Sequence, residues 1–291
     1  MADFHICAAI VTYNPDIGLL EKNISAVIDQ VEHLYIYDNA STNLAEIEKL
    51  TDDERITIVK SDSNYGISKA LNELCSMALE CGYNWVLTLD HDTIICNNFI
   101  DNCRSLIRDC DLKIAIVCPR VKYVGLEIKE KGDVSCRFSR VSACMTSGSF
   151  MSLIAWNEVG GFDEYMVIDW VDNDICTNFV LHGYVIVRNN QIFMEHKLGS
   201  AVKRKFGLVT LIDYQYSAFR VYHIVRNGIY YRKKYRKNIN QLKMAVINLL
   251  TRIKFRILYR KDKERFYAIK RGVKDGRNML GKNLSNRVSS K

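Results

Sequence analysis

The stretch Trp85-Val86-Leu87-Thr88-Leu89 is a short apolar run that leads directly into the polar triplet Asp90-His91-Asp92. A run of this kind is typical of a strand buried in a parallel sheet. Two carboxylates one residue apart at a strand end can hold one hard divalent cation, such as Mg²⁺ or Mn²⁺. The same pattern also occurs in ordinary surface turns, so its meaning depends on the surrounding sequence. We expect Asp90 and Asp92 to form a metal site, with His91 pointing back toward the protein.

Strand-type and helix-type segments alternate on both sides of this stretch. Short apolar runs predict strands at 5–11, 34–37, 56–59 and 114–117, and helical spacing of apolar residues predicts helices at 17–30, 66–81 and 97–110. This alternation predicts an α/β fold, with a mostly parallel sheet covered by helices on both faces. Ligands bind such sheets beyond the carboxyl ends of the strands. Polar clusters follow four strands, at Thr12-Tyr13-Asn14, Asp38-Asn39, Asn64-Tyr65-Gly66 and Asp90-His91-Asp92.

The length and composition fit a folded protein of the cytoplasm. A chain of 291 residues accommodates one large α/β domain, or one domain with a helical appendage. The start at Met1 lacks a basic secretory region, and no window reaches about 18 uncharged apolar residues. All ten cysteines lie between Cys7 and Cys176, and none forms a CxxC pair. We therefore expect free structural thiols in a reducing compartment.

The charge is divided sharply between the two parts of the chain. Residues 1–196 contain 15 Lys and Arg against 29 Asp and Glu, a net charge of −14, whereas residues 197–291 contain 26 against 4, a net charge of +22. The basic part has clusters at 203–205 and 232–237, followed by an apolar stripe at helical spacing from Ile239. A solvated helical face and nucleic-acid binding are two interpretations, but no known nucleic-acid-binding module accompanies the charge. We favour a basic, amphipathic helical region over 201–291 that binds an anionic membrane surface, with no nucleic-acid partner.

The polar strand ends belong to a longer series of motifs. In order, these are Ile10-Val11-Thr12-Tyr13-Asn14, Asp38-Asn39-Ala40-Ser41, Asn64-Tyr65-Gly66-Ile67-Ser68-Lys69-Ala70-Leu71-Asn72, Leu89-Asp90-His91-Asp92, Thr146-Ser147-Gly148-Ser149, Gly161-Phe162-Asp163-Glu164, Ile168-Asp169-Trp170-Val171-Asp172-Asn173-Asp174, Glu195-His196-Lys197-Leu198-Gly199 and Tyr222-His223-Ile224-Val225-Arg226-Asn227. The series resembles the family-2 glycosyltransferases, and in particular their rhamnosyltransferase-like subgroup, over roughly residues 5–235. The resemblance implies a GT-A fold over 1–200, with a nucleotide-binding half at about 1–118 and an acceptor half at about 119–200.

The resemblance also implies roles for individual residues. The nucleotide-sugar would contact Thr12, Tyr13, Asn14, Asp38, Asn39, Asn64, Gly66, Lys69, Asp90, His91 and Arg226. The metal ligands would be Asp90, Asp92 and His196, and the sugar and acceptor side would include Ser147, Gly148 and Trp170. Several of these have plain alternatives: Asn14 and Asn64 as turn formers, Lys69 as a solvated helix residue, His196 as a structural histidine and Arg226 as a salt-bridge partner.

Several neighbouring carboxylates are candidates for the catalytic base. Transfer of a sugar to an alcohol needs a base that removes the hydroxyl proton. In the family this base is an aspartate of an acidic motif, which corresponds here to Asp172, with Asp163, Asp169 and Asp174 as competitors. Related proteins usually have an arginine a few residues further on, where this chain has Asn178. This departure puts the usual anchoring of the motif helix in doubt.

Together these features predict an inverting glycosyltransferase of the cytoplasm, bound peripherally to the inner face of the plasma membrane. Its donor would be dTDP-L-rhamnose and its acceptor a lipid-linked or growing surface polysaccharide, such as O-antigen or capsule. The alternatives are a UDP-hexose transferase (galactosyl, glucosyl or galactofuranosyl) and a catalytically silent nucleotide-binding or partner-binding module. The sequence is also compatible with a homodimer.

Overall fold

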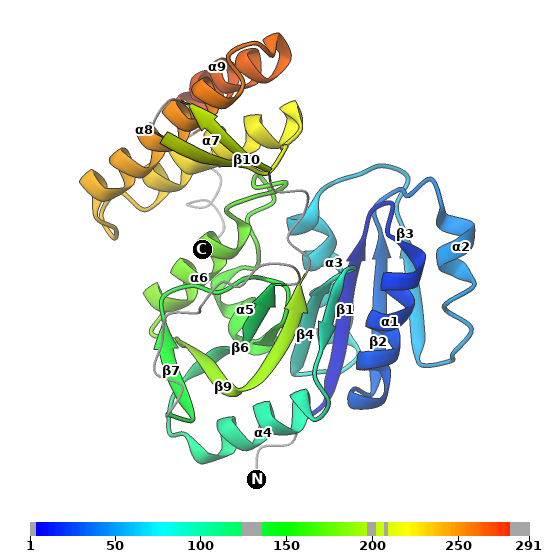
Figure 1. Cartoon of the computed structure of the whole chain (residues 1–291). Coiled ribbons are helices and arrows are strands. Elements are labelled where there is room, and N and C mark those ends of the chain that lie inside the picture. The colour runs from blue at the N-terminus through cyan, green and yellow to red at the C-terminus, as the bar shows by residue number, and fades with distance from the viewer. Residues whose placement is uncertain (1–3, 124–135, 197–201, 207–208, 280–291) are drawn as a thin grey trace. The chain divides into compact units, whose positions relative to one another are not determined.

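The computed structural model describes residues 4–123, 136–196, 202–206 and 209–279 (Figure 1). The chain divides into two compact units, the first made of 1–167 with 171–198 and the second of 168–170 with 199–291. The short segment 168–170 therefore belongs to a different unit from the residues on either side of it. Of the motif at 195–199, the residues after His196 lie outside the described part of the chain.

The first unit alternates strands and helices over most of its length. Its elements are β1 (Ile6–Thr12), α1 (Ile17–Val27), η1 (Ile28–Gln30), β2 (His33–Asp38), α2 (Leu44–Glu48), β3 (Ile56–Lys60), α3 (Ile67–Glu80), β4 (Trp85–Asp90), β5 (Thr93–Ile95), α4 (Phe99–Asp109), β6 (Ile114–Tyr123), β7 (Phe138–Val141), β8 (Ser149–Ser152), α5 (Leu153–Val159), α6 (Val171–Leu181) and β9 (Val185–His196). The α/β class predicted from the sequence is confirmed.

One large sheet runs through the first unit in the order β3-β2-β1-β4-β8-β6-β9-β5, and β7 pairs with β9. The strands β3, β2, β1 and β4 are parallel, as predicted. Strand β8 is antiparallel to both of its neighbours, so the second half of the sheet is mixed. In the parallel part Thr12 pairs with Asp38, and Val11 pairs with Asp90. Three of the four predicted polar clusters therefore begin at one edge of the sheet.

Both faces of the parallel strands are covered, because successive side chains of a strand point to opposite faces. Ile6, Ala8 and Ile10 of β1 belong to the hydrophobic core that α1 and α4 close. The alternate residues Cys7 and Ala9 are equally buried on the other face, which α3 covers. Helices on two faces explain why β1 and the buried part of β4 are apolar without interruption.

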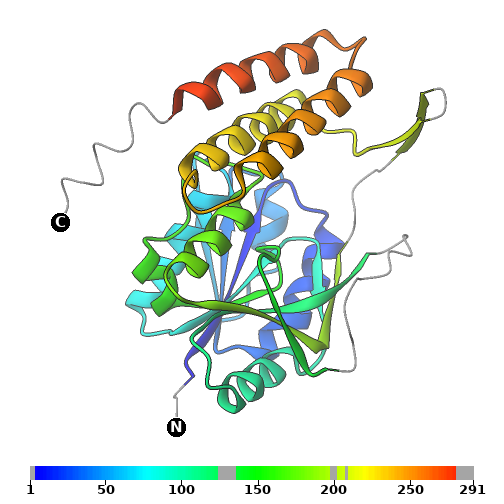
Figure 2. The ribbon, with the colours of Figure 1, turned by 90° about the vertical axis from the view of Figure 1, so that its left-hand side faces the viewer.

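The second unit consists of β10 (Val202–Phe206), β11 (Val209–Asp213), α7 (Ala218–Lys234), α8 (Gln241–Leu258) and α9 (Lys263–Asn278). The three helices lie side by side (Figures 1 and 2) around a small core that includes Val221, Phe255 and Ile269. The predicted helical region is confirmed, but the sequence did not predict the antiparallel hairpin β10-β11, which contains the basic cluster 203–205. The Arg204 guanidinium donates to the buried Asp213 carboxylate across the hairpin at 2.7 Å, an ion pair that holds it together.

Two absences predicted from the sequence concern membrane spans and disulfides. Within the described ranges no helix has the length and apolar character that a bilayer crossing needs. The ten cysteines are all free thiols.

A glycine turn joins α3 to the loop that precedes α6. Gly66 precedes α3 with φ of 87°, and the Ile67 N–H donates to the Val167 carbonyl at 2.9 Å. A Cβ on Gly66 would lie 2.4 Å from both the carbonyl oxygen and Cγ1 of Val167. Both the backbone conformation and the close approach therefore require glycine at this position.

We expect Gly66→Ala to lower the free energy of unfolding by about 2–4 kcal/mol, because a left-handed backbone and an overpacked contact each cost about 1–3 kcal/mol. Gly82→Ala is the matched control. Gly82 also has φ of 87°, but a Cβ there would meet no atom within 4 Å, so only the backbone cost applies. Urea denaturation measures both variants, and equal losses would contradict the role of the Val167 contact.

Candidate active site

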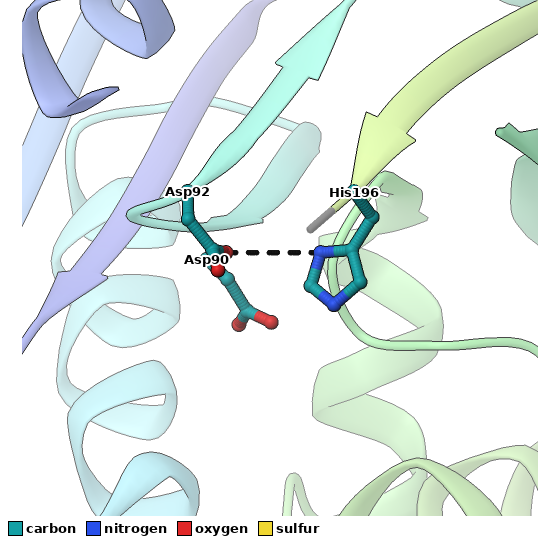
Figure 3. A group of neighbouring side chains, drawn as sticks. All are labelled: Asp90, Asp92 and His196. Carbon is teal, nitrogen blue, oxygen red and sulfur yellow. Dashed lines mark ion pairs between the residues drawn. The ribbon is translucent and has the colours of Figure 1, made fainter. Parts of the chain in front are cut away.

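Two aspartates and a histidine converge at the carboxyl edge of the sheet. Asp90 ends β4, Asp92 follows in the turn, and His196 ends β9, which pairs with β5. Each residue offers one ligand atom, and these atoms lie within 4.8 Å of one another. Figure 3 shows the three side chains around one shared space, with His196 Nδ1 3.7 Å from Asp92 Oδ1. The antiparallel pairing of Thr93 with His196 places the histidine beside the aspartates.

Hydrogen bonds from buried side chains fix this triad. The Asp90 N–H donates to Ser147 Oγ at 2.8 Å, and the Asp90 carbonyl accepts from Asn23 Nδ2 at 2.7 Å. The Thr93 hydroxyl lies 2.7 Å from Ser147 Oγ and 3.2 Å from His196 Nδ1. Ser147 was predicted on the acceptor side, and here its buried side chain contacts the backbone of the triad. Asn23 and Thr93 were not predicted; nothing in the local pattern of α1 marks Asn23.

The three side chains that form this cluster suit a divalent cation. Two carboxylates supply the hard oxygen ligands that Mg²⁺ and Mn²⁺ prefer, and an imidazole nitrogen is accepted by many divalent transition metals. All three residues are half-buried, so the ligand atoms are supported by the protein and open on one side. His196 is placed where it can bind such an ion, and its ring also lies 6.4 Å from the Tyr123 ring.

A second cluster lies at the ends of β1 and β2. The Thr12 hydroxyl donates to Asp38 Oδ1 at 2.9 Å, and Asp38 Oδ2 accepts from the Ser41 N–H at 2.9 Å. Asn39 connects this cluster to the turn before α3, since its Nδ2 donates to the Gly66 carbonyl at 3.3 Å. Thr12, Asp38, Asn39 and Gly66 are thus brought together at the same edge of the sheet as Asp90.

Other residues predicted at the nucleotide have local partners. Asn14, with φ of 47°, accepts from the Thr42 N–H at 2.8 Å, and Asn64 accepts from the Gly66 N–H at 3.0 Å. Both amides therefore shape turns. Lys69 Nζ lies 3.7 Å from the centroid of the Tyr65 ring and 3.7 Å from a Glu73 carboxylate oxygen. Tyr13 is 49% exposed, and His91 is half-buried.

Asp172 is the predicted base that faces a pocket. It stands in the first turn of α6, where its Oδ1 accepts from the Asn173 N–H at 3.0 Å. The pocket that it lines in the first unit is also bordered by Thr88, Thr146 and Phe162. An aspartate at the start of a helix is also favoured by the helix dipole. Asp172 therefore has a fixed position at the edge of a small cavity that is lined mostly by apolar side chains.

The three competing aspartates are buried or bonded to neighbouring groups. Asp163 is buried and accepts from the Tyr165 N–H at 3.2 Å. Asp174 is 2% exposed within α6. Asp169 pairs with the Arg220 guanidinium at 3.1 Å. Burial raises the pKa of Asp169, and Arg220 opposes that rise. None of the three lines the pocket that Asp172 borders.

The segment 168–170 is held in a strained conformation within the second unit. Asp169 and Trp170 have φ of 60° and 69°, a region that costs an ordinary residue about 1–2 kcal/mol. The fully buried Asn227 donates through Nδ2 to the carbonyls of Ile168 and Asp169 at 2.8 and 3.0 Å. The Trp170 indole N–H donates to the Ile224 carbonyl at 3.1 Å. These bonds explain how two consecutive left-handed residues persist two positions before Asp172.

Four further predicted positions can now be described. Arg226 donates to Asn227 Oδ1 at 2.9 Å and belongs, like Trp170, to the second unit. Gly148 has φ of 78°, and a Cβ there would lie 2.4 Å from the Met194 sulfur. Asn178 Nδ2 donates to the Val159 carbonyl at 2.9 Å, so the residue that replaces the usual arginine connects α6 to the end of α5.

Comparison with known proteins gives three concordant results. The profile of the family described as glycosyl transferase family 2 matches residues 7–169. The dTDP-rhamnosyl transferase RfbF of Shigella flexneri is 28% identical over 243 residues, which are 79% of this chain and 80% of that protein. Two solved structures share the fold. TarS of S. aureus in complex with UDP-GlcNAc matches with a TM-score of 0.57 at 13% identity over 94% of this chain and 80% of the other. GalNAc-T7 with UDP, GalNAc and Mn²⁺ matches with a TM-score of 0.58 at 12% identity over 82% of this chain, which spans about half, 52%, of that protein.

We expect Ser147→Ala to weaken Mn²⁺ binding about tenfold, because groups that orient metal ligands are typically worth 10–100-fold in affinity. The variant leaves the buried Asp90 N–H and Thr93 hydroxyl without the Ser147 oxygen. Titration calorimetry with Mn²⁺ measures the change. Ser152→Ala is the control, since Ser152 caps α5 and its loss affects stability by about 1 kcal/mol without touching the triad. Unchanged Mn²⁺ affinity in Ser147→Ala would contradict the supporting role.

Proposed function

The chain belongs to glycosyl transferase family 2, and we propose that it transfers L-rhamnose from dTDP-L-rhamnose, with inversion, onto a lipid-linked or growing surface polysaccharide. That it is a nucleotide-sugar glycosyltransferase follows from the family and from the GT-A fold. The observation that carries the proposal is the convergence of Asp90, Asp92 and His196 beside the Thr12–Asp38 cluster at one sheet edge. The likeness to a dTDP-rhamnosyl transferase over 79% of the chain supports rhamnose as the sugar and thymine as the nucleobase of the donor.

Donor binding begins at the ends of β1 and β2. A thymine or uracil ring presents an imide N–H, for which a carboxylate is a suitable acceptor. Asp38 is the residue assigned to this contact; its carboxylate is buried and accepts from Thr12 and the Ser41 N–H, so base binding would have to expose it. The turn at Asn64–Gly66 and the nearby Lys69 line the nucleotide side. Arg226 would neutralise phosphate charge when the leaving group departs.

Asp90, Asp92 and His196 would hold Mg²⁺ or Mn²⁺. When bound, such an ion supplies Lewis-acid stabilisation of the negative charge on the leaving diphosphate. The protein contributes a fixed ligand geometry, because Ser147, Thr93 and Asn23 restrain the residues that carry the ligands.

Asp172 would remove the proton of the acceptor hydroxyl. The hydroxyl oxygen then attacks the anomeric carbon from the side opposite the diphosphate, which inverts the configuration. Of the four candidate aspartates, Asp172 lines the cavity described above, whereas Asp163 accepts from the Tyr165 N–H, Asp169 pairs with Arg220 and Asp174 is buried within α6.

The remaining assignments concern the acceptor side and the cellular location. We assign donor binding to about 1–118, acceptor binding to about 119–200 with Gly148 and Trp170 on that side, and membrane attachment to 201–291. Ser147, which was expected on the acceptor side, instead supports the Asp90 backbone. A lipid-linked acceptor is itself anionic and lies at a membrane. The basic second part of the chain therefore suits a protein that works at the inner face of the plasma membrane.

We expect Asp172→Asn to lower the transfer rate by about 10²–10⁴-fold, the usual contribution of a general base. Affinity for dTDP should be unchanged, because Asp172 is assigned to the acceptor side. Rates come from transfer to a polyprenyl-diphosphate-linked glycan, and calorimetry with dTDP gives the affinity.

Asp174→Asn is the matched control for Asp172→Asn, since it makes the same change two residues away on the same helix. It should retain transfer within about threefold, beyond any loss of folded protein. Full activity of Asp172→Asn would remove it as the base, and loss of chemistry in a folded Asp174→Asn would transfer the role to Asp174.

A panel of donors tests the sugar nucleotide. With Mn²⁺ present, dTDP-L-rhamnose should raise Tm more than UDP-glucose, UDP-galactose or UDP-galactofuranose, since a ligand at about 100 times its Kd stabilises by about 2.7 kcal/mol. The double variant Asp90→Asn/Asp92→Asn should lose most of the metal-dependent part of the shift. A larger shift with a UDP-hexose would favour the UDP-hexose alternative over rhamnose.

A further inference from the structure

Helix α8 carries an exposed stripe of large apolar side chains. Leu242 is 76% and Leu250 58% exposed. The other members of the stripe are Val246, Leu249, Ile253 and Ile257, all of them exposed. At about 100° per residue these six positions fall within roughly 100° of the helix circumference. An apolar surface this continuous is unusual on a water-exposed helix and marks an interaction surface.

The stripe faces away from the core of its own unit. The buried residues of α8 are Asn248 and Phe255, on the opposite side of the helix. Asn248 Nδ2 donates to the Gly228 carbonyl of α7 at 2.8 Å, and Phe255 lies in the core beside Tyr259. These contacts fix the rotation of α8 within the second unit. The stripe is therefore not needed for packing of that unit.

Basic side chains border the stripe on both edges. By the same helical spacing, Lys243 and Lys254 follow one edge, and Arg252 and Arg256 follow the other. No Asp or Glu occurs between residues 214 and 261. An apolar face between two rows of Lys and Arg is the pattern of helices that lie in the interface of an anionic membrane. A second copy of this chain would bring an equally basic surface against it, and like charges would repel.

We propose that the exposed face of α8 lies in the surface of an anionic lipid bilayer. Its Leu, Ile and Val side chains enter the region between headgroups and acyl chains, while the flanking Lys and Arg contact lipid phosphates. The inference gives the proposed transferase a defined route to a lipid-linked acceptor. The biological role of this membrane binding rests on the proposed function. The binding itself does not, because it requires neither sugar donor nor acceptor.

Vesicle co-sedimentation of the full chain tests the proposal. Vesicles of phosphatidylcholine alone are compared with vesicles that contain about 30% phosphatidylglycerol. We expect at least tenfold stronger partitioning onto the anionic vesicles, and a decrease as NaCl screens the headgroup contacts. Leu250→Gln should weaken partitioning onto the anionic vesicles by about fivefold, because it removes one inserted apolar side chain.

Ile154→Gln is the matched control, since Ile154 is 57% exposed on α5 of the first unit. It should leave partitioning unchanged. Donor hydrolysis in solution, measured with dTDP-L-rhamnose and Mn²⁺, should be the same in wild type and Leu250→Gln. If neither vesicle binds the protein, or if both variants bind like wild type, the surface is not a lipid site. If light scattering shows a dimer that dissociates in the Leu250→Gln variant, the stripe is instead the contact surface for a second copy of the chain. Vesicle binding by a chain without transferase activity would leave this inference standing and remove only the proposed sugar transfer.

Discussion

The parallel pairing of β1 with β2 and β4 is the constraint on which the rest of the site depends. Because the three strands run the same way in a fixed register, Thr12, Asp38 and Asp90 emerge at one edge of the sheet. The apolar residues before them are buried on both faces, so a slip in register would move a carboxylate into the apolar interior. The spacing between Asp38 and Asp90 is therefore set by the backbone of the paired strands.

The mixed half of the sheet supplies the remaining residues of the cluster around Asp90. Strand β9 brings His196 beside Asp92, and the segment before β8 supplies Ser147, whose hydroxyl bonds to the Asp90 backbone and to Thr93. One buried hydroxyl thus connects the ends of β4, β5 and β8. Buried polar groups of this kind are costly unless every partner is present, so the cluster also favours a single arrangement of the strands.

Strain next to Asp172 has a clear structural source. Asp169 and Trp170 adopt left-handed backbone conformations, which are costly for a bulky residue such as tryptophan. Asn227, Ile224 and Arg220 of α7 hold them by hydrogen bonds and an ion pair. Sites under such strain are common at functional positions. The motif at 222–227 thus has a physical role within the second unit, since its buried asparagine holds the carbonyls of Ile168 and Asp169.

The sequence by itself determined the α/β class, the strands that end in polar clusters, the family resemblance and the charge division, because these follow from hydrophobic period and residue order. Only the tertiary structure decided that Ser147, Thr93 and Asn23 support the cluster of Asp90, Asp92 and His196. It also decided that Asn14 and Asn64 shape turns, and that Asp172 lines a cavity while Asp169 pairs with Arg220. The hairpin β10-β11 was likewise hidden, and although the sequence predicted the apolar stripe of α8, only the structure decided that this stripe is exposed. Such contacts join residues far apart in the chain, and a local pattern carries no information about which partner a side chain meets.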